Sequence, residues 1–246
     1  MAIPEEFETT GEYFFQWRSY LPLAMAVLFI LALAQFRYPF ADHRLNLAWD
    51  GGCLALALLG QVVRFFTVGF VPRGTSGRNT RGQVAEVLNT TGMYAVVRNP
   101  LYLGNLIIWF GLSLFMKSLW FSTIVMLFFT LFYERIIWRE EAFLREKFGD
   151  TFMQWAAATP AIIPQFKNWR PPSLPFSWKS AINREYGTFF AIIATFTVLE
   201  LLAGLFNFGT LTLDAIWVKL FLGSAVLYLT IRYLKKKTKV LATDNR

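Results

Sequence analysis

Two residue types that build many catalytic and metal sites are almost absent from this sequence. It contains one cysteine, Cys53, and one histidine, His43. A single cysteine excludes an internal disulfide and a cysteine-rich metal site. A single histidine argues against a histidine-based metal cluster or a catalytic triad. We therefore expect no metal ion in the function of this chain.

Charged residues are scarce as well, at 16% of the 246 residues, whereas a soluble domain carries about a quarter. Apolar residues make up 55% and come in long blocks, and the mean hydropathy is +0.42. This combination predicts an all-α protein that crosses a membrane several times. The net charge of +8 does not indicate a nucleic-acid partner, because no basic, aromatic-rich soluble module is present.

Long apolar blocks set the number of predicted spans, because a helix needs about 20 residues to cross ~30 Å of hydrocarbon. The block at 101–133 is too long for one helix and is interrupted at Met116-Lys117-Ser118, which predicts a tight helical hairpin. The sequence thus predicts about six spanning helices, at residues 20–36, 52–71, two within 101–133, 187–207 and 214–234. Acidic residues precede the first apolar block, which is unlike a cleavable signal peptide.

The chain divides into four predicted regions. An N-terminal segment with the first span covers 1–51, and a core with spans two to four and an amphipathic helix covers 52–165. A proline-rich interfacial linker follows at 166–186, and two further spans with a basic tail cover 187–246.

Lysine and arginine distribution predicts the orientation. With both termini inside, nineteen basic residues fall in the inner segments and three in the outer segments. Basic residues concentrate on the cytoplasmic side of membrane proteins. We therefore expect an integral membrane protein with both termini and both long polar segments in the cytosol, in the inner membrane if the chain is bacterial.

One polar segment ends in residues that are typical of a capped helix start. Within 88–105, Asn99 precedes Pro100 as a helix cap, with proline favoured in the first turn. The free N–H groups of such a helix start attract carboxylate or phosphate. Arg98 adds positive charge, and Gly104 allows something to pack against bare backbone. A well-capped helix with interfacial tyrosines remains the alternative interpretation.

A second stretch, at 134–155, has the pattern of an interfacial helix that continues from the fourth span. Glu140 and Glu141 are adjacent and cannot both face lipid, so at least one should point at a partner or ligand. A solvated helix with surface salt bridges is the alternative.

Together the two stretches resemble the isoprenylcysteine carboxyl methyltransferase and phospholipid methyltransferase superfamily over roughly residues 52–165. The pattern reads Gly92-x-Tyr94-x3-Arg98-Asn99-Pro100-x-Tyr102-x-Gly104 and then Glu140-Glu141-x2-Leu144-x3-Phe148-Gly149-x2-Phe152-x2-Trp155. The usual motif has histidine where this chain has Asn99, and tyrosine in place of Phe152 and Trp155. Any role that needs a titrating imidazole is therefore lost here.

The resemblance implies a membrane enzyme that uses S-adenosylmethionine. The cofactor would lie between the third span and the amphipathic helix, with a carboxylate on its amino group or cation. The positions that the resemblance assigns to cofactor binding are Gly92, Tyr94, Asn99, Pro100, Tyr102, Leu103, Gly104, Glu140 and Glu141.

Three arginines in the preceding loop suggest the acceptor. Arg73, Arg78 and Arg81 lie within nine residues, among glycines that let the backbone fold around an anion. Together with Arg98 they would bind and orient an anionic group, since the guanidinium fork suits phosphate and carboxylate. A phosphate monoester is ionised at neutral pH and needs no base, whereas an amine would be repelled. Nonspecific binding of lipid headgroups is the alternative.

The flanking segments resemble a bacterial branch, the lipid A 1-phosphate methyltransferases. An isoprenylcysteine carboxylate or a phospholipid amine remains open as the acceptor. A lipid-binding scaffold and a transporter are the non-enzymatic alternatives, although neither inverted repeats nor broken midplane helices are visible. The sequence leaves the oligomeric state open.

Three ionisable residues lie within predicted spans, where charge is costly and often functional. They are Arg64, Glu200 and Lys219. For Arg64 and Lys219 we favour side chains that extend to an interface. His43 lies in an outer loop and is expected to be inert.

Overall fold

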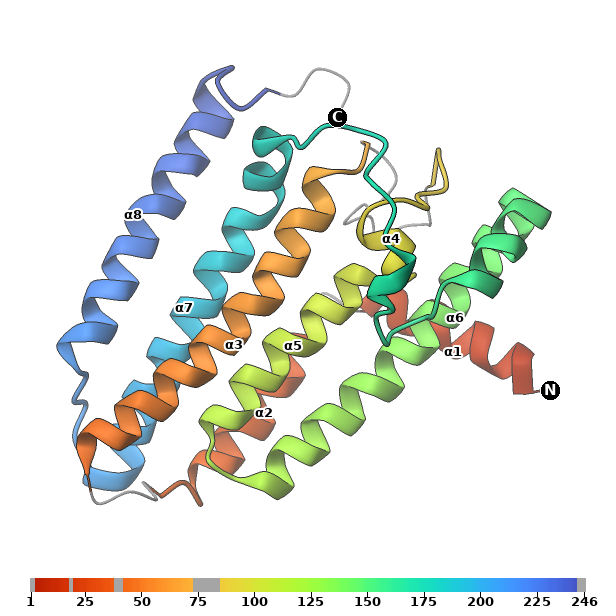
Figure 1. The fold of residues 1–246 in the computed structure, drawn as a ribbon. Coiled ribbons are helices and arrows are strands. Elements are labelled where there is room, and N and C mark those ends of the chain that lie inside the picture. The colour runs from red at the N-terminus through yellow and green to blue at the C-terminus, as the bar shows by residue number, and fades with distance from the viewer. Residues whose placement is uncertain (1–2, 18–19, 38–41, 73–84, 243–246) are drawn as a thin grey trace.

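The computed structural model describes residues 3–17, 20–37, 42–72 and 85–242, and the regular structure in these ranges is helical (Figure 1). In chain order the elements are α1 (Ile3–Trp17), α2 (Leu21–Leu33), α3 (His43–Gly69), α4 (Met93–Val96), α5 (Pro100–Phe115), α6 (Leu119–Ala158), the 3-10 turn η1 (Phe166–Asn168), α7 (Trp178–Phe208) and α8 (Ala215–Lys237). The predicted all-α fold is confirmed.

Four of these helices are long and apolar enough to cross a membrane, namely α3, α6, α7 and α8, and α5 is a shorter apolar helix of 16 residues. A helix therefore lies at each of the six predicted positions, but α2 has only 13 residues. The protein is a polytopic membrane protein, and the count of six spans stays a prediction. Two helices extend beyond the predicted spans, since α3 begins at His43, ahead of the span at 52–71, and α7 begins at Trp178, ahead of the span at 187–207.

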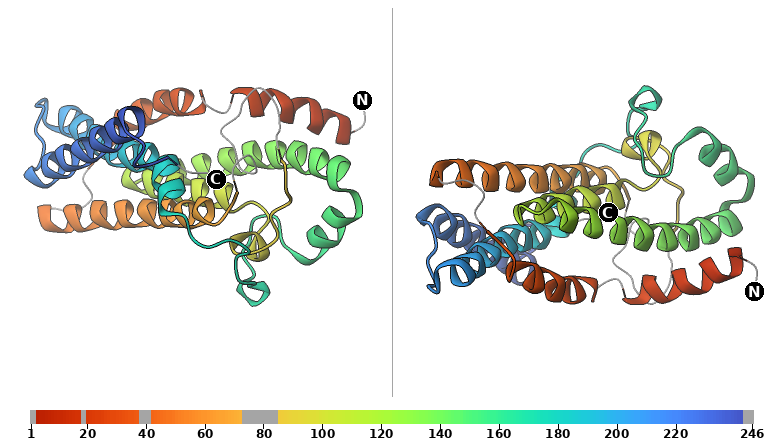
Figure 2. Two further views of the ribbon diagram at one scale, coloured as in Figure 1. Left: turned by 90° about the horizontal axis from the view of Figure 1, so that it is seen from above. Right: turned by 90° about the horizontal axis from the view of Figure 1, so that it is seen from below.

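The centre of the bundle is the contact between α3 and α5, which glycines make close. A Cβ atom on Gly60 would lie 2.5 Å from the carbonyl oxygen of Gly104, and one on Gly104 would lie 2.8 Å from that of Gly60. Figure 2 shows α5 and α6 between α3 on one side and α1 and α2 on the other. Any larger residue at Gly60 or Gly104 would push the two helices apart.

The predicted hairpin of 101–133 is confirmed as α5, a short turn and α6. Lys117 lies in this turn with a φ of +53°, in the left-handed region. Its buried ammonium group pairs with Asp50 of α3 and lies over the rings of Phe36 and Phe115. The turn is thus fixed to α3 at the end of the bundle where α3 begins, which we call the turn end.

The opposite end, where α3 ends and α5 and α7 begin, carries the residues of the two motif stretches and is called the motif end. Here α6 continues beyond its apolar part, as the sequence predicted, and changes direction at Gly149, whose φ is +52°. Helix α1 packs on this extension through the ring pair Phe7–Trp138 and the ion pair Glu12–Arg139. The extension is therefore held from the side.

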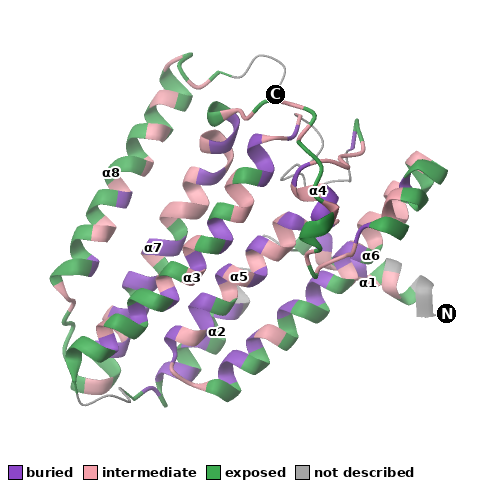
Figure 3. Ribbon diagram, in the orientation of Figure 1, coloured by how far each residue is buried: buried purple, intermediate pink, exposed green. Residues whose placement is uncertain are grey.

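Burial follows the helix contacts (Figure 3). Buried residues face neighbouring helices, whereas the outer faces expose many large apolar side chains. On α8, Trp217 and Ser224 alone are buried. An apolar exterior of this kind is what a bilayer covers.

Candidate functional site

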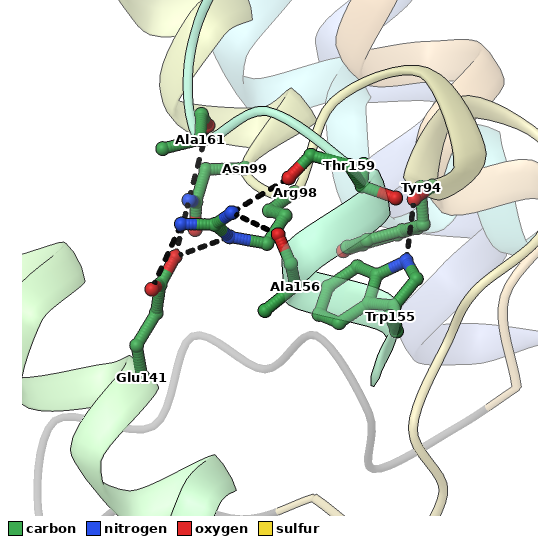
Figure 4. A network of polar contacts seen from close by, with 8 residues as sticks. All are labelled: Tyr94, Arg98, Asn99, Glu141, Trp155, Ala156, Thr159 and Ala161. Atoms are coloured by element: carbon green, nitrogen blue, oxygen red, sulfur yellow. Dashed lines mark hydrogen bonds and ion pairs between the residues drawn. The ribbon is translucent and has the colours of Figure 1, made fainter. Parts of the chain in front are cut away.

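The first contact of the site joins the two motif stretches, which are far apart in sequence. Arg98 donates from Nε to Oε1 of Glu141 at 2.8 Å and from Nη2 to Oε2 at 3.0 Å (Figure 4). Both side chains are 17% exposed. This two-pronged geometry is the strong form of an arginine–carboxylate pair.

Arg98 also holds the end of α6 and the chain that follows it. Its Nη1 donates to the carbonyl oxygens of Ala156 at 2.8 Å and Thr159 at 2.6 Å, and its backbone N–H donates to Pro160 at 2.8 Å. Four of the five guanidinium N–H groups are engaged. Arg98 thus joins the Glu141 carboxylate to the end of α6. Its predicted contact with an acceptor anion stays a prediction.

Asn99 is the N-cap residue of α5, and Pro100 occupies the first turn, as the sequence predicted. The amide side chain does not cap the helix. Its Nδ2 donates instead to the carbonyl oxygen of Ala161 at 3.1 Å and, at the limit of hydrogen-bond distance, to Oε1 of Glu141 at 3.5 Å. Asn99 and Glu141 are thus near enough to contact one small molecule.

Glu140 is engaged by the same helix, one turn deeper. The hydroxyl of Tyr102 donates to Oε1 of Glu140 at 2.9 Å, and the Tyr102 ring lies 4.9 Å from that of Tyr133. Glu140 therefore contacts α5, and Glu141 contacts the two residues that precede it. With Arg98 as the cation among these groups, the cluster carries a net charge of −1. Leu103 lies on the same turn, and its N–H donates to Asn99.

Tyr94 and Gly92 lie on the stretch that leads to Arg98. The indole N–H of Trp155 donates to the carbonyl oxygen of Tyr94 at 3.0 Å. Gly92 has a φ of +60° and donates its N–H to the carbonyl oxygen of Arg170 at 2.9 Å. A residue with a side chain would be strained at Gly92 and would meet Pro172 at 3.2 Å.

Residues 159–173, which we call the strap, run antiparallel to residues 91–99 and cover them. The hydrogen bonds between them are Arg98 N to Pro160 O, Gln165 N to Val96 O, Gly92 N to Arg170 O and Ser173 N to Thr91 Oγ1. Sequence reasoning treated most of this segment as an interfacial linker and missed its contacts. Its prolines predict an extended chain, but no pattern predicts which segment it pairs with.

Gly104 faces α3, and Arg64 fills the space beside it. A Cβ on Gly104 would lie 2.5 Å from Cγ of Arg64. The Arg64 guanidinium donates to both carboxylate oxygens of Glu185, at 2.9 and 2.7 Å, and to Oδ1 of Asn105 at 2.8 Å. The interpretation of Arg64 as a side chain that extends to the interface is therefore wrong. Contact of Gly104 with a cofactor stays a prediction.

Other predicted residues contribute less here. Arg73, Arg78 and Arg81 lie outside the described residues. Lys219 is exposed and Glu200 is buried. His43 begins α3, and its exposed ring lies 3.4 Å from Asp214. The described ranges contain no group of three or more histidine, cysteine, aspartate or glutamate side chains placed to hold a metal ion.

Comparison with known proteins supports the resemblance. Residues 53–151 match the model of a family described as phospholipid methyltransferase, which confirms the resemblance at superfamily level, whereas the lipid A branch is not confirmed. No solved structure matches.

Two curated relatives are metal-resistance proteins. The cobalt-zinc-cadmium resistance protein CzcN of Cupriavidus metallidurans is 31% identical over 125 residues, which is 51% of this chain and 57% of that protein. The nickel-cobalt-cadmium resistance protein NccN of Alcaligenes xylosoxydans xylosoxydans is 31% identical over 125 residues, 51% of this chain and 58% of that protein. The chain thus spans less than two thirds of either relative.

Proposed function

From the match of residues 53–151 to the phospholipid methyltransferase family, we propose that this membrane protein is an S-adenosylmethionine-dependent methyltransferase. Its acceptor is a lipid-borne anion, a lipid phosphate such as the 1-phosphate of lipid A. The observation that carries the proposal is the approach of Asn99 and Arg98 to Glu141, because it joins both motif stretches in one half-buried cluster.

The cluster fits the charge of the cofactor. Two carboxylates and one guanidinium leave a net charge of −1, and S-adenosylmethionine carries a sulfonium cation and an amino group. Glu140 and Glu141 would hold these groups, and the rings of Tyr102 and Tyr133 supply apolar and aromatic surface beside them. When bound, this cofactor supplies an electrophilic methyl group and retains the electron pair of the broken carbon–sulfur bond.

The protein's own part is to orient and to exclude water. Arg98 fixes the direction of the Glu141 carboxylate, and the strap covers the loop that carries Arg98. Methyl transfer requires in-line alignment more than acid–base chemistry, and alignment alone is worth several powers of ten in rate. The scarcity of histidine is therefore compatible with the reaction.

The acceptor is inferred from charge. Arg73, Arg78 and Arg81 precede the site in sequence and would bring positive charge to it. A phosphate monoester is already an anion at neutral pH and attacks without a general base. An isoprenylcysteine carboxylate shares this property, whereas an amine must first lose a proton. We place the site and both termini on the cytosolic side, because the basic residues concentrate there.

The test uses the purified protein in nanodiscs with methyl-labelled S-adenosylmethionine and three acceptors: lipid A, an isoprenylated cysteine peptide and phosphatidylethanolamine. We expect labelled lipid A, detected by mass spectrometry as a gain of one methyl group. Label on phosphatidylethanolamine alone would overturn the anionic acceptor. Absence of cofactor binding in calorimetry would overturn the enzyme and favour a lipid-binding scaffold or a transporter.

A further inference from the structure

A second polar cluster lies deeper in the bundle, next to the candidate site but separate from it. It consists of Gln61 and Arg64 on α3, Asn105 on α5 and Glu185 on α7, and we call it the Arg64 cluster. The side chains of Arg64 and Glu185 are 12% and 2% exposed. Burying both charges is expensive, and replacing such a pair by apolar residues is often neutral or stabilising. Stability alone therefore gives no reason for its presence.

The geometry of the cluster requires arginine and not merely a positive charge. The guanidinium reaches Glu185 through Nε and Nη2 and Asn105 through Nη1. Gln61 supports the carboxylate, since its Nε2 donates to Oε2 of Glu185 at 3.2 Å and to the Glu185 carbonyl oxygen at 3.3 Å. A lysine ammonium could pair with Glu185 but could not make the same planar set of bonds.

The cluster acts on the helix that carries the motif. Asn105 follows Tyr102 by three residues, which is about 4.5 Å along the helix axis. Arg64 therefore binds α5 one turn below the Tyr102–Glu140 contact, and its stem lies against the bare backbone of Gly104. These two contacts fix both the height and the rotation of the first turns of α5 relative to α3.

We propose that Arg64 and Glu185 are positioning residues for methyl transfer. Glu185 orients Arg64, and Arg64 holds α5 through Asn105 and Gly104, so that Asn99 and Tyr102 meet the two glutamates of α6. Glu185 lies on α7, beyond the family match at 53–151. Under this proposal α7 contributes a positioning residue to the reaction. The inference rests on the proposed function and names further residues for it.

The test compares two double variants that each remove one buried ion pair. Arg64→Met with Glu185→Met removes the pair at the motif end, and Asp50→Leu with Lys117→Met removes the pair at the turn end. Both leave apolar residues, so neither strands a charge. We expect comparable heat-inactivation midpoints, a loss of about 100-fold in kcat for the first variant because of misalignment, and a change below about twofold for the second.

Two single variants isolate the contact with α5. Asn105→Ala keeps the ion pair and removes the third bond of Arg64, and Arg64→Lys keeps the charge. Both should lower kcat about tenfold while the affinity for S-adenosylmethionine changes less, since misplacement costs the reaction more than it costs binding. Unchanged kcat in Asn105→Ala and in Arg64→Met with Glu185→Met would overturn the positioning role.

A readout without turnover separates this inference from the proposed function. Hydrogen exchange at the amides of residues 101–105 should be about tenfold faster in Arg64→Met with Glu185→Met and unchanged in Asp50→Leu with Lys117→Met. If the unaltered protein transfers no methyl group, the proposed function fails, and exchange still tests the positioning. Equal exchange in the two double variants would overturn it.

Discussion

Two buried ion pairs in the described part of the bundle lie at opposite ends of it and differ in the groups that they contact. Lys117 and Asp50 are 2% and 3% exposed, and they join the turn between α5 and α6 to α3. Aromatic rings surround the ammonium group, since it lies over those of Phe36 and Phe115. Arg64 and Glu185 instead join three helices and reach α5 next to Tyr102.

The difference leads us to expect that burial of a charge does not by itself indicate a functional role. Each pair has one member on α3, which is long enough to span a membrane, so a place on a spanning helix does not distinguish them. The distinction is the partner: one pair binds a turn, and the other binds the helix start that carries the candidate site. Changes to Lys117 or Asp50 should therefore lower stability alone, whereas changes to Arg64 or Glu185 should lower activity.

The largest expected effect is on stability, from Asp50→Asn. This change removes the carboxylate charge that pairs with the buried Lys117 ammonium, and breaking a buried ion pair costs about 3–5 kcal/mol. The heat-inactivation midpoint in nanodiscs should fall sharply, while turnover per folded molecule stays as before. Lower turnover per folded molecule would show that the turn end also affects the site, and it would contradict the claim that this pair affects stability alone.

The next largest effect is expected on the affinity for S-adenosylmethionine, from Glu141→Gln. A hydrogen bond to a charged group is worth about 1.5–3 kcal/mol, so the affinity for S-adenosylmethionine should fall about 10- to 100-fold. Calorimetry measures this directly. Glu146→Gln, an exposed glutamate on the same helix, is the matched control and should bind normally. Equal affinity in both variants would contradict the role of Glu141.

A smaller effect is expected from Gly60→Ala, with Gly52→Ala as the control on the same helix. The new methyl group would lie 2.5 Å from the Gly104 carbonyl oxygen, whereas at Gly52 nothing lies within 4 Å. Overpacking costs about 1–3 kcal/mol, and the shift of α5 should lower turnover as well. Heat inactivation and turnover both report on it. A Gly60→Ala protein as stable and active as Gly52→Ala would show that the helices separate easily.

The smallest effect is expected from His43→Ala at the turn end. The imidazole is 69% exposed beside Asp214, and such surface pairs contribute about 0–1 kcal/mol. Turnover and the heat-inactivation midpoint should both match those of the unaltered protein. A measurable loss of turnover would assign a function to the one histidine, contrary to our expectation from sequence.

Sequence alone predicted the elements whose signals are local. The Met116-Lys117-Ser118 interruption marked the turn between α5 and α6, and Asn99-Pro100 marked the start of α5. The pairing of the two motif stretches followed from the family resemblance, and the contact of Arg98 with Glu141 agrees with it.

What sequence could not predict depends on contacts between distant segments. The partner of Arg64 is Glu185, 121 positions away, and nothing near Arg64 in the chain indicates it. The strap likewise bonds mainly through backbone groups, which do not depend on residue type except at proline and therefore leave little trace in the sequence. Likewise, no pattern near Gly104 indicated that the Arg64 side chain of α3 lies against it.

The part of α6 that precedes the kink at Gly149 has a length with a geometric consequence. From Leu119 to Glu140 the helix rises about 31 Å, at about 1.5 Å per residue, which matches the ~30 Å thickness of the hydrocarbon layer. This stretch is therefore as long as the hydrocarbon layer is thick, and the glutamate pair lies at its end. At the level of the glutamates, a lipid could present its headgroup without leaving its leaflet. A water-soluble donor could reach the same level without entering the hydrocarbon layer.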